Sequence, residues 1–256
     1  MGLFDMFSKE GRTEAALKRA AAKAIHKHIQ SPDRMKALDD LYRAGEEGSE
    51  EAIYALLKRF SFVYDKTIED EQEKDWTYNA VCSLGEKALE PVRRYIMHAD
   101  SISWPLRILE KIATEEEIWA TVQKLLEEHE PGYERDPAVK QQLLTFISER
   151  KDPRSAGMIA PYFEDMDETV RFVVVESLLK TKDPAAREPL CARFVDPKED
   201  SLRIRVRIAN GFVELGWDVV GFRGQFEKLL PEGFMLDKQG RVKHSRRHDE
   251  KPVETE

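Results

Sequence analysis

The sequence predicts an all-α fold: a right-handed solenoid of about six helical hairpins, with a small β-hairpin at its C-terminal end. Three observations lead to this prediction. Apolar residues recur three and four positions apart through much of the 256-residue chain, as in 52–60, 120–130 and 138–150, which is the spacing of one helix face. Two-residue alternation is rare. A residue pattern returns every 28–35 positions, which indicates a repeat architecture.

The repeat is clearest around Val170-Arg171. Its unit has an apolar stripe at Val170, Val174 and Leu178, followed by Asp183-Pro184. The same chemistry recurs 31 residues earlier and 34 residues later, with weaker copies near Trp104 and Trp76. The matching positions are Val139-Lys140, Leu143, Ile147 and Asp152-Pro153 in the earlier copy, and Ile204-Arg205, Ile208 and Phe212 in the later one.

Each unit is expected to form two helices. The first helix carries the apolar stripe, and Asp-Pro opens the second helix, because Asp caps free backbone N–H groups and Pro suits the first helical position. Residues 202–208, LRIRVRI, alternate like a strand. Their place in the repeat aligns Ile204, Ile208 and Phe212 with the buried stripe, so we predict a helix over 201–215.

Three regions follow from this pattern. Residues 1–30 form an N-terminal arm and an Ala-rich helix, which covers about 13–30 and is ended by Ser31-Pro32. Residues 31–230 form the repeat array. Residues 231–256 form a hairpin around the turn Asp237-Lys238-Gln239-Gly240, followed by a polar tail expected to be disordered.

These units resemble HEAT repeats, and in particular the short bacterial HEAT-like repeats of the phycobilisome-lyase type. The resemblance lies in Asp167-xx-Val170-Arg171-xx-Val174-xxx-Leu178 followed by Asp183-Pro184 and Leu190, and it covers about residues 31–230. It implies an α-solenoid. It says little about activity, since such arrays serve as scaffolds, adaptors and enzymes.

One cation recurs at the same repeat position. Lys140, Arg171 and Arg205 occupy it, and Arg107 lies nearby in its own unit. In HEAT-like arrays this helix usually borders the concave groove, so the resemblance implies that these residues form a partner-binding groove for an anion or an acidic partner. The alternative, which the resemblance favours, is a ladder between repeats in which each cation bonds to a neighbouring carboxylate such as Asp136 or Asp167.

Several kinds of chemistry find no support in the residues. HEAT-repeat hydroxylases resembling this fold place a His-Glu pair after the Val-Arg, where this chain has Phe172-Val173, so we expect no metal and no cofactor. Nucleophile, phosphate-loop and dinucleotide motifs are absent. Cys82 and Cys191 lie in apolar helical patterns and are expected to be reduced core thiols. A net charge of −8 argues against a nucleic-acid partner.

Two further segments have alternative interpretations. Leu3, Phe4 and Phe7 would share one face of a helix and precede the basic residues of 9–27, which together suggest a contact with a membrane surface; a terminal arm docked on the first helices is the other interpretation. The acidic run 68–75 is expected to be a solvated loop and helix start, or else a site for a basic partner or a divalent ion. Trp76 and Trp104 fall at apolar repeat positions and are expected in the core.

We therefore expect a non-catalytic, cytoplasmic scaffold or adaptor that binds a partner protein along the concave face of the solenoid. The sequence has no secretory signal pattern and no apolar run of the roughly 18–20 residues that a membrane-spanning helix needs. Two alternatives stay open: a lyase-like or protein- or cofactor-modifying enzyme using the groove, and recruitment to a membrane through the N-terminal arm. The partner and the oligomeric state are not predicted.

Overall fold

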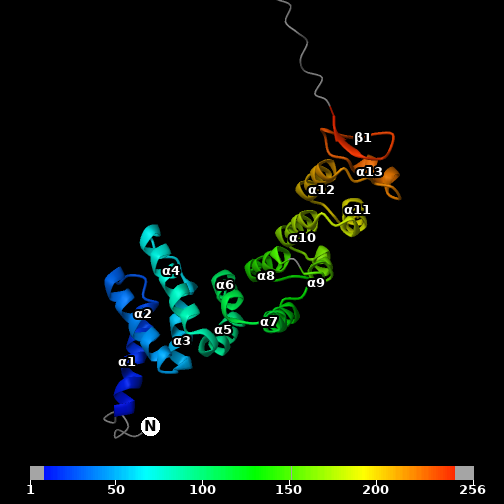
Figure 1. Cartoon of the computed structure of the whole chain (residues 1–256). Coiled ribbons are helices and arrows are strands. Elements are labelled where there is room, and N and C mark those ends of the chain that lie inside the picture. The colour runs from blue at the N-terminus through cyan, green and yellow to red at the C-terminus, as the bar shows by residue number, and fades with distance from the viewer. Residues whose placement is uncertain (1–8, 151, 246–256) are drawn as a thin grey trace, which may run out of the picture. The chain divides into compact units, whose positions relative to one another are not determined.

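A computed structural model describes residues 9–150 and 152–245, and side-chain burial from residue 13 onward. The chain divides into two compact units, Met1–Glu128 and His129–Glu256. All regular structure in the described residues is helical apart from one short hairpin (Figure 1). This confirms the prediction of an all-α repeat fold with a C-terminal β-hairpin.

Unit 1, Met1–Glu128, contains seven α-helices in its described residues. The helices α2, α4 and α6 pack side by side in one row, and α1, α3 and α5 in another (Figure 1). The bounds are α1 Lys9–Ala24, α2 Ser31–Glu46, α3 Glu50–Leu57, α4 Thr67–Ser83, α5 Leu89–Ile96, α6 Ser103–Ile112 and α7 Glu115–Glu128, with 3-10 turns η2 Lys58–Ser61 and η3 Gly85–Ala88.

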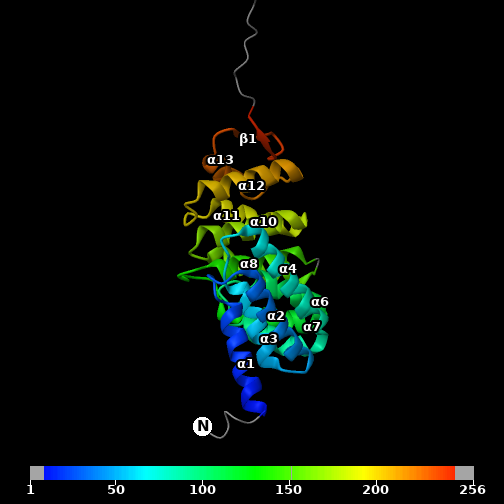
Figure 2. The same cartoon turned by 90° about the vertical axis from the view of Figure 1, so that its left-hand side faces the viewer.

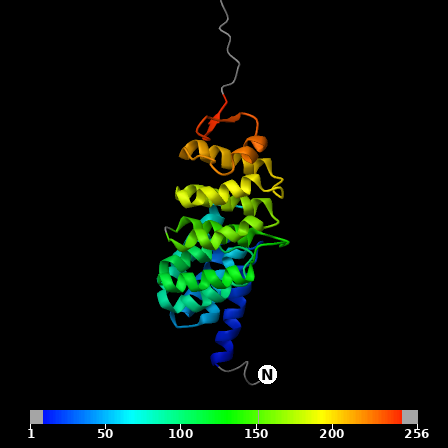
Figure 3. The ribbon, with the colours of Figure 1, turned by 90° about the vertical axis from the view of Figure 1, so that its right-hand side faces the viewer.

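Unit 2, His129–Glu256, repeats the arrangement. The helices α8, α10 and α12 stack on one another (Figures 2 and 3), and α11 packs against α13. The bounds are α8 Ala138–Glu149, α9 Arg154–Ile159, α10 Glu168–Thr181, α11 Arg187–Val195, α12 Leu202–Leu215 and α13 Arg223–Leu229, with 3-10 turns η4 Ala160–Glu164 and η5 Pro184–Ala186.

The predicted apolar stripes form the core of unit 2. In α8, α10 and α12 every stripe residue is buried, which confirms the repeat register. These residues are Val139, Leu143 and Ile147; Val170, Val174 and Leu178; and Ile204, Ile208 and Phe212.

The segment LRIRVRI is helical, as its repeat position predicts. The Ser201 hydroxyl accepts a hydrogen bond from the backbone N–H of Ile204 and caps the start of α12. Gly216 ends the helix in the left-handed conformation, with φ 67°, which glycine adopts without a Cβ clash. A cap at each end and a buried helical stripe therefore outweigh the local alternation of residues 202–208.

Two predicted boundaries need correction. The Ala-rich helix α1 ends at Ala24, and Ser31-Pro32 begins the next helix instead of ending this one. The acidic run 68–75 is neither a loop nor wholly solvated, because it lies inside α4 and buries Asp70 and Glu73.

The chain past α13 forms the predicted hairpin. Strand β1 (Phe234–Leu236) pairs antiparallel with β2 (Val242–His244), with Leu236 opposite Val242. The loop between them contains Asp237–Gly240, and Gly240 has φ 78°. The strand β2 packs against α12, so the hairpin covers the end of the helical stack in unit 2.

Candidate functional site

Lys140, the first cation of the recurring position, is buried within unit 2. Its side chain is 2% exposed. The ammonium Nζ lies 2.9 Å from Asp165 Oδ2 and donates a second hydrogen bond of 2.9 Å to the carbonyl oxygen of Gly132. Lys140 therefore joins its own turn to the turn of the next repeat.

Arg171 makes the equivalent connection one repeat later. Its guanidinium donates two hydrogen bonds of 3.1 Å to the carboxylate of Glu199, and Arg193 donates a third to the same carboxylate at 2.7 Å. Burial alone would raise the pKa of Glu199, but hydrogen bonds from Arg171, the backbone of Ser201, and Arg193 hold that pKa below its ordinary value. Glu199 is therefore an ionised structural group.

Arg205 continues the series with backbone acceptors. It is half-buried, and its guanidinium donates to the carbonyl oxygens of Phe194, Asp196 and Glu199. These three cations thus hold the turns of unit 2 together, as the ladder interpretation expects. Arg171 also lines a shallow surface pocket of about 350 Å³.

The ladder uses other carboxylates than the sequence suggested. Asp165 and Glu199 are its acids, whereas Asp167 caps α10 by accepting from the Val170 backbone N–H at 2.9 Å. Asp136 accepts from the backbone of Ala138. Both expected partners are local caps because their short side chains reach the free N–H groups of the next helix first.

Unit 1 contains a matching buried cluster that the sequence analysis missed. Arg34 and Arg59 both donate through Nε to Glu73, at 2.7 and 2.8 Å, and Arg59 also pairs with Asp70 at 2.6 Å. Burial would raise the pKa of Glu73, but hydrogen bonds from Arg34, Ser31 and Arg59 lower it overall. One buried glutamate between two arginines is therefore common to both units.

Arg107 differs from the other three predicted cations. It lies on α6, and its side chain is exposed. Its guanidinium stands 4.5 Å from the centre of the Trp104 ring and 5.1 Å from that of Tyr78, within the range of a cation–π contact. Of the four predicted groove cations, Arg107 is the one whose side chain is fully exposed.

The face around Arg107 is lined with aromatic side chains. On the adjacent helices α2, α4 and α6, four rings are only half-buried, which corrects the expectation that both tryptophans lie in the core. The rings of Tyr42 and Trp76 meet edge to face at 6.1 Å between centres, and those of Tyr78 and Trp104 lie 6.0 Å apart. We call these four residues and Arg107 the aromatic row: Tyr42, Trp76, Tyr78, Trp104 and Arg107.

The aromatic row flanks the exposed side of α4. Trp76 and Tyr78 lie on opposite edges of that side, because Trp76 meets Tyr42 of α2 and Tyr78 meets Trp104 of α6. Asn79 is exposed between them. Phe60 stacks on the Trp104 ring at 5.5 Å and fixes its orientation. The result is a face of ordered, partly uncovered rings spanning three helices.

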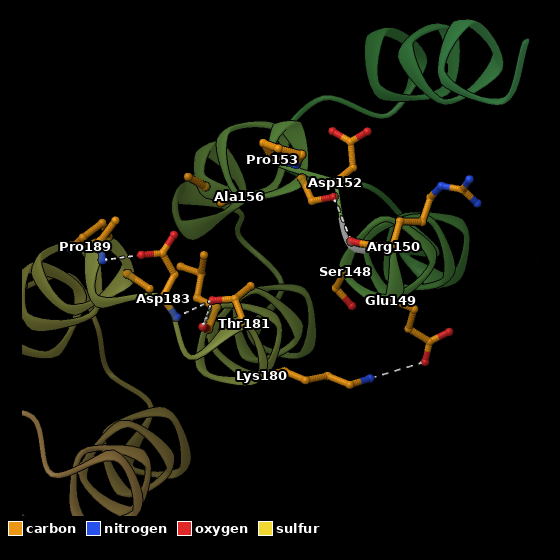
Figure 4. A pocket seen from close by; sticks show the side chains of 15 residues that line it. Ser148, Glu149, Arg150, Asp152, Pro153, Ala156, Lys180, Thr181, Asp183 and Pro189 are labelled. Carbon is orange, nitrogen blue, oxygen red and sulfur yellow. Dashed lines mark hydrogen bonds and ion pairs between the residues drawn. The ribbon is translucent and has the colours of Figure 1, made fainter. Parts of the chain in front are cut away.

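A pocket without aromatic residues lies elsewhere, in unit 2. It measures about 810 Å³ and lies between the turns that follow α8 and α10 (Figure 4). Several of its charged side chains have partners: Lys180 lies 3.6 Å from Glu149, Asp183 caps the Ala185 N–H, and Asp152 pairs with Arg154 at 2.7 Å. These groups therefore stabilise the turns that border the pocket.

Reactive groups do not gather in the described residues. No group of three or more His, Cys, Asp or Glu side chains among them could hold a metal ion. Burial raises the pKa of the Cys191 thiol to about 12, so this cysteine is neutral at physiological pH. None of the described helices has the length and apolar composition to cross a membrane. Leu3, Phe4 and Phe7, the predicted membrane-contact residues, lie outside the described residues.

Comparison with known proteins agrees with the geometry of the turns and ladders. The family model for HEAT repeats matches residues 122–209, which include α8 to α11 and most of α12. No curated protein matches the chain, and the phycobilisome-lyase type stays a resemblance. The buried stripes, the capped turns and the family match lead to one conclusion: residues 122–209 of this chain are HEAT repeats.

Proposed function

We propose that this chain is a non-catalytic scaffold that binds a partner protein on the exposed face of α2, α4 and α6. HEAT repeats are commonly protein-interaction modules. The observation that carries the proposal is the aromatic row, in which four half-buried rings lie on three neighbouring helices and two of them, Tyr78 and Trp104, contact the exposed Arg107.

The composition of the row matches the energetics of protein interfaces. Trp, Tyr and Arg are the residue types most enriched among those that dominate binding energy. Rings already held by neighbours lose little rotational freedom when a partner covers them. Contacts such as Phe60 against Trp104 supply this order before binding.

The charged clusters support a structural role over a catalytic one. Glu73 and Glu199 each receive hydrogen bonds from two arginines and have lowered pKa values, whereas a general acid at neutral pH needs a raised pKa. The enzyme alternative would require a reactive group elsewhere. The expected cytoplasmic location stays a prediction.

Site-specific photocrosslinking in cells tests the proposal. A photoreactive amino acid replaces Asn79, which is exposed in the middle of the row, and in a matched variant it replaces Lys124, which is exposed on α7. We expect a discrete crosslinked product from position 79 but not from position 124. Adding Arg107→Ala should weaken that product, because the exposed guanidinium is removed without opening the core.

Two results would contradict the proposal. One is the same set of crosslinked products from positions 79 and 124, which would indicate random encounters with other proteins instead of specific binding at the aromatic row. The other is a product from position 79 whose yield is unchanged by Arg107→Ala together with Trp76→Ala. Circular dichroism on each variant shows whether the helices remain folded.

A further inference from the structure

The aromatic row carries hydrogen-bond donors that the fold leaves unused. Within the described residues, the indole N–H groups of Trp76 and Trp104 donate no hydrogen bond, and neither nitrogen is buried. The exposed amide of Asn79 also donates none to the part of the chain that the structure describes. The Arg107 guanidinium contacts two rings and donates to no other described group. The row therefore presents free donors next to its aromatic rings.

One ring pair of the row lies on each side of α4. Tyr42 and Trp76 meet where α2 contacts α4, and Tyr78 and Trp104 meet where α4 contacts α6. Packed helices lie about 8–10 Å apart. A ligand that crosses α4 therefore meets one ring pair, the exposed Asn79 and then the other ring pair, with about 8–10 Å between the two pairs.

An extended proline-rich segment matches both the spacing and the donors. The polyproline II conformation has three residues per turn and a rise of about 3.1 Å per residue, so residues i and i+3 lie on one side, about 9 Å apart. It contains no internal hydrogen bonds, so its carbonyl oxygens are free to accept from a binding surface. A helical ligand would use most of its carbonyl oxygens internally and would leave the donors of the row unpaired.

We propose that the aromatic row binds a proline-rich segment of the partner in the polyproline II conformation. Two prolines three residues apart pack on the ring pairs on either side of α4. The carbonyl oxygens between them accept hydrogen bonds from Trp76, Asn79 and Trp104. Aromatic surfaces suit such segments because the segment is already ordered before it binds. This inference rests on the proposed binding of a partner at the row and specifies the chemistry of that partner.

An NMR titration of the full chain tests the inference. The chain contains four tryptophans, so its indole N–H groups give few signals, and those of Trp119 and Trp217, which lie outside the row, serve as internal references. The probe is a peptide of ten prolines, and the control is an uncharged Gly-Ser peptide of the same length. We expect the proline peptide to shift the signals of Trp76 and Trp104 with a Kd on the order of 0.1 mM, and the references to stay in place.

A pair of conservative substitutions tests the donors. Trp76→Phe together with Trp104→Phe keeps a ring at each position and removes both indole N–H groups. Fluorescence anisotropy of a labelled proline peptide should show about a fivefold or greater rise in Kd, because two hydrogen bonds are lost. The matched control Trp217→Phe removes an indole N–H from a half-buried tryptophan of unit 2 and should change Kd less than about twofold.

Three results would overturn the inference: no shift of Trp76 and Trp104 with the proline peptide, equal shifts with the Gly-Ser peptide, or an unchanged Kd in the folded double variant. If circular dichroism shows that the double variant is misfolded, the titration of the unchanged chain decides. A partner that is crosslinked from position 79 but has no proline-rich segment would overturn this inference and leave the proposed function intact. Binding of the proline peptide without any crosslinked partner in cells would contradict the proposed function alone.

Discussion

At the residue scale, the same motif stabilises both units: one buried glutamate shared by two arginines. Glu73 binds Arg34 and Arg59 in unit 1, and Glu199 binds Arg171 and Arg193 in unit 2. Each member loses water on folding, and that cost is offset only while every partner is present.

Removing one arginine should therefore destabilise the fold strongly. Arg171→Ala leaves the carboxylate of Glu199 buried with two of its four hydrogen bonds, and we expect a loss of about 3–5 kcal/mol in the free energy of unfolding. Urea denaturation measures it. The control Arg135→Ala removes an exposed arginine and should change the free energy by less than about 0.5 kcal/mol. Similar effects of the two changes would mean that the cluster is not structural.

The same carboxylates predict how stability depends on pH. The pKa values of Glu73 and Glu199 are below the ordinary glutamate value of 4.5 in the folded chain, so the folded state binds protons less readily than the unfolded state. Their stabilisation is full above the unfolded pKa and is lost as pH falls through the lower folded pKa. We expect melting temperatures to be steady from pH 7 to 5.5 and to fall below pH 4.5, and Glu73→Gln should reduce that fall. A melting temperature that rises on acidification would contradict this assignment.

At the element scale, the helices α8, α10 and α12, each the first helix of its repeat, pack so closely that one added methyl group should change the stability of unit 2. Gly211 of α12 faces Leu179 of α10, and a Cβ at Gly211 would lie 2.6 Å from Leu179 Cδ1. Leu179 is itself buried. Gly157 of α9 has no atom within 4 Å of the same position.

Alanine at these two glycines should have opposite effects. Gly211→Ala should destabilise unit 2 by about 1–3 kcal/mol through overpacking. Gly157→Ala should stabilise it by about 0.5–1 kcal/mol, because alanine favours a helix and nothing opposes its methyl group. Thermal unfolding of both variants shows whether each substitution raises or lowers the stability. A stabilising Gly211→Ala would show that α10 and α12 are less tightly packed than described.

Sequence reasoning worked best where a signal was periodic. The stripe Ile204, Ile208, Phe212 predicts helix α12 correctly, because its register is fixed by neighbouring repeats as well as by its own residues. The acidic run 68–75 was wrongly predicted to be a solvated loop. Its composition alone cannot show that Arg34 and Arg59, which lie outside the run, neutralise Glu73. The aromatic row was missed for a similar reason: Trp76 and Trp104 occupy apolar repeat positions, and only the packing of three helices shows that both remain half-exposed.

At the scale of the whole molecule, charge and side-chain type are distributed unevenly. The basic residues of α1 and the aromatic row of α2, α4 and α6 are separate surfaces with different chemistry, whereas the ion pairs of unit 2 are buried in its turns. A scaffold of stacked repeats can carry several such surfaces, because each repeat contacts only its neighbours. We expect binding of a partner to α2, α4 and α6 to be independent of changes to α1.

Binding at the aromatic row is tested by the affinity of the crosslinked partner for the purified full chain. Isothermal titration calorimetry compares the unchanged chain with Arg107→Ala and with Lys124→Ala, which removes the same charge from α7. We expect Arg107→Ala to raise Kd about 10- to 30-fold, as for a residue that dominates an interface. Lys124→Ala should change Kd less than about twofold. Equal Kd values for all three proteins would contradict binding at the aromatic row.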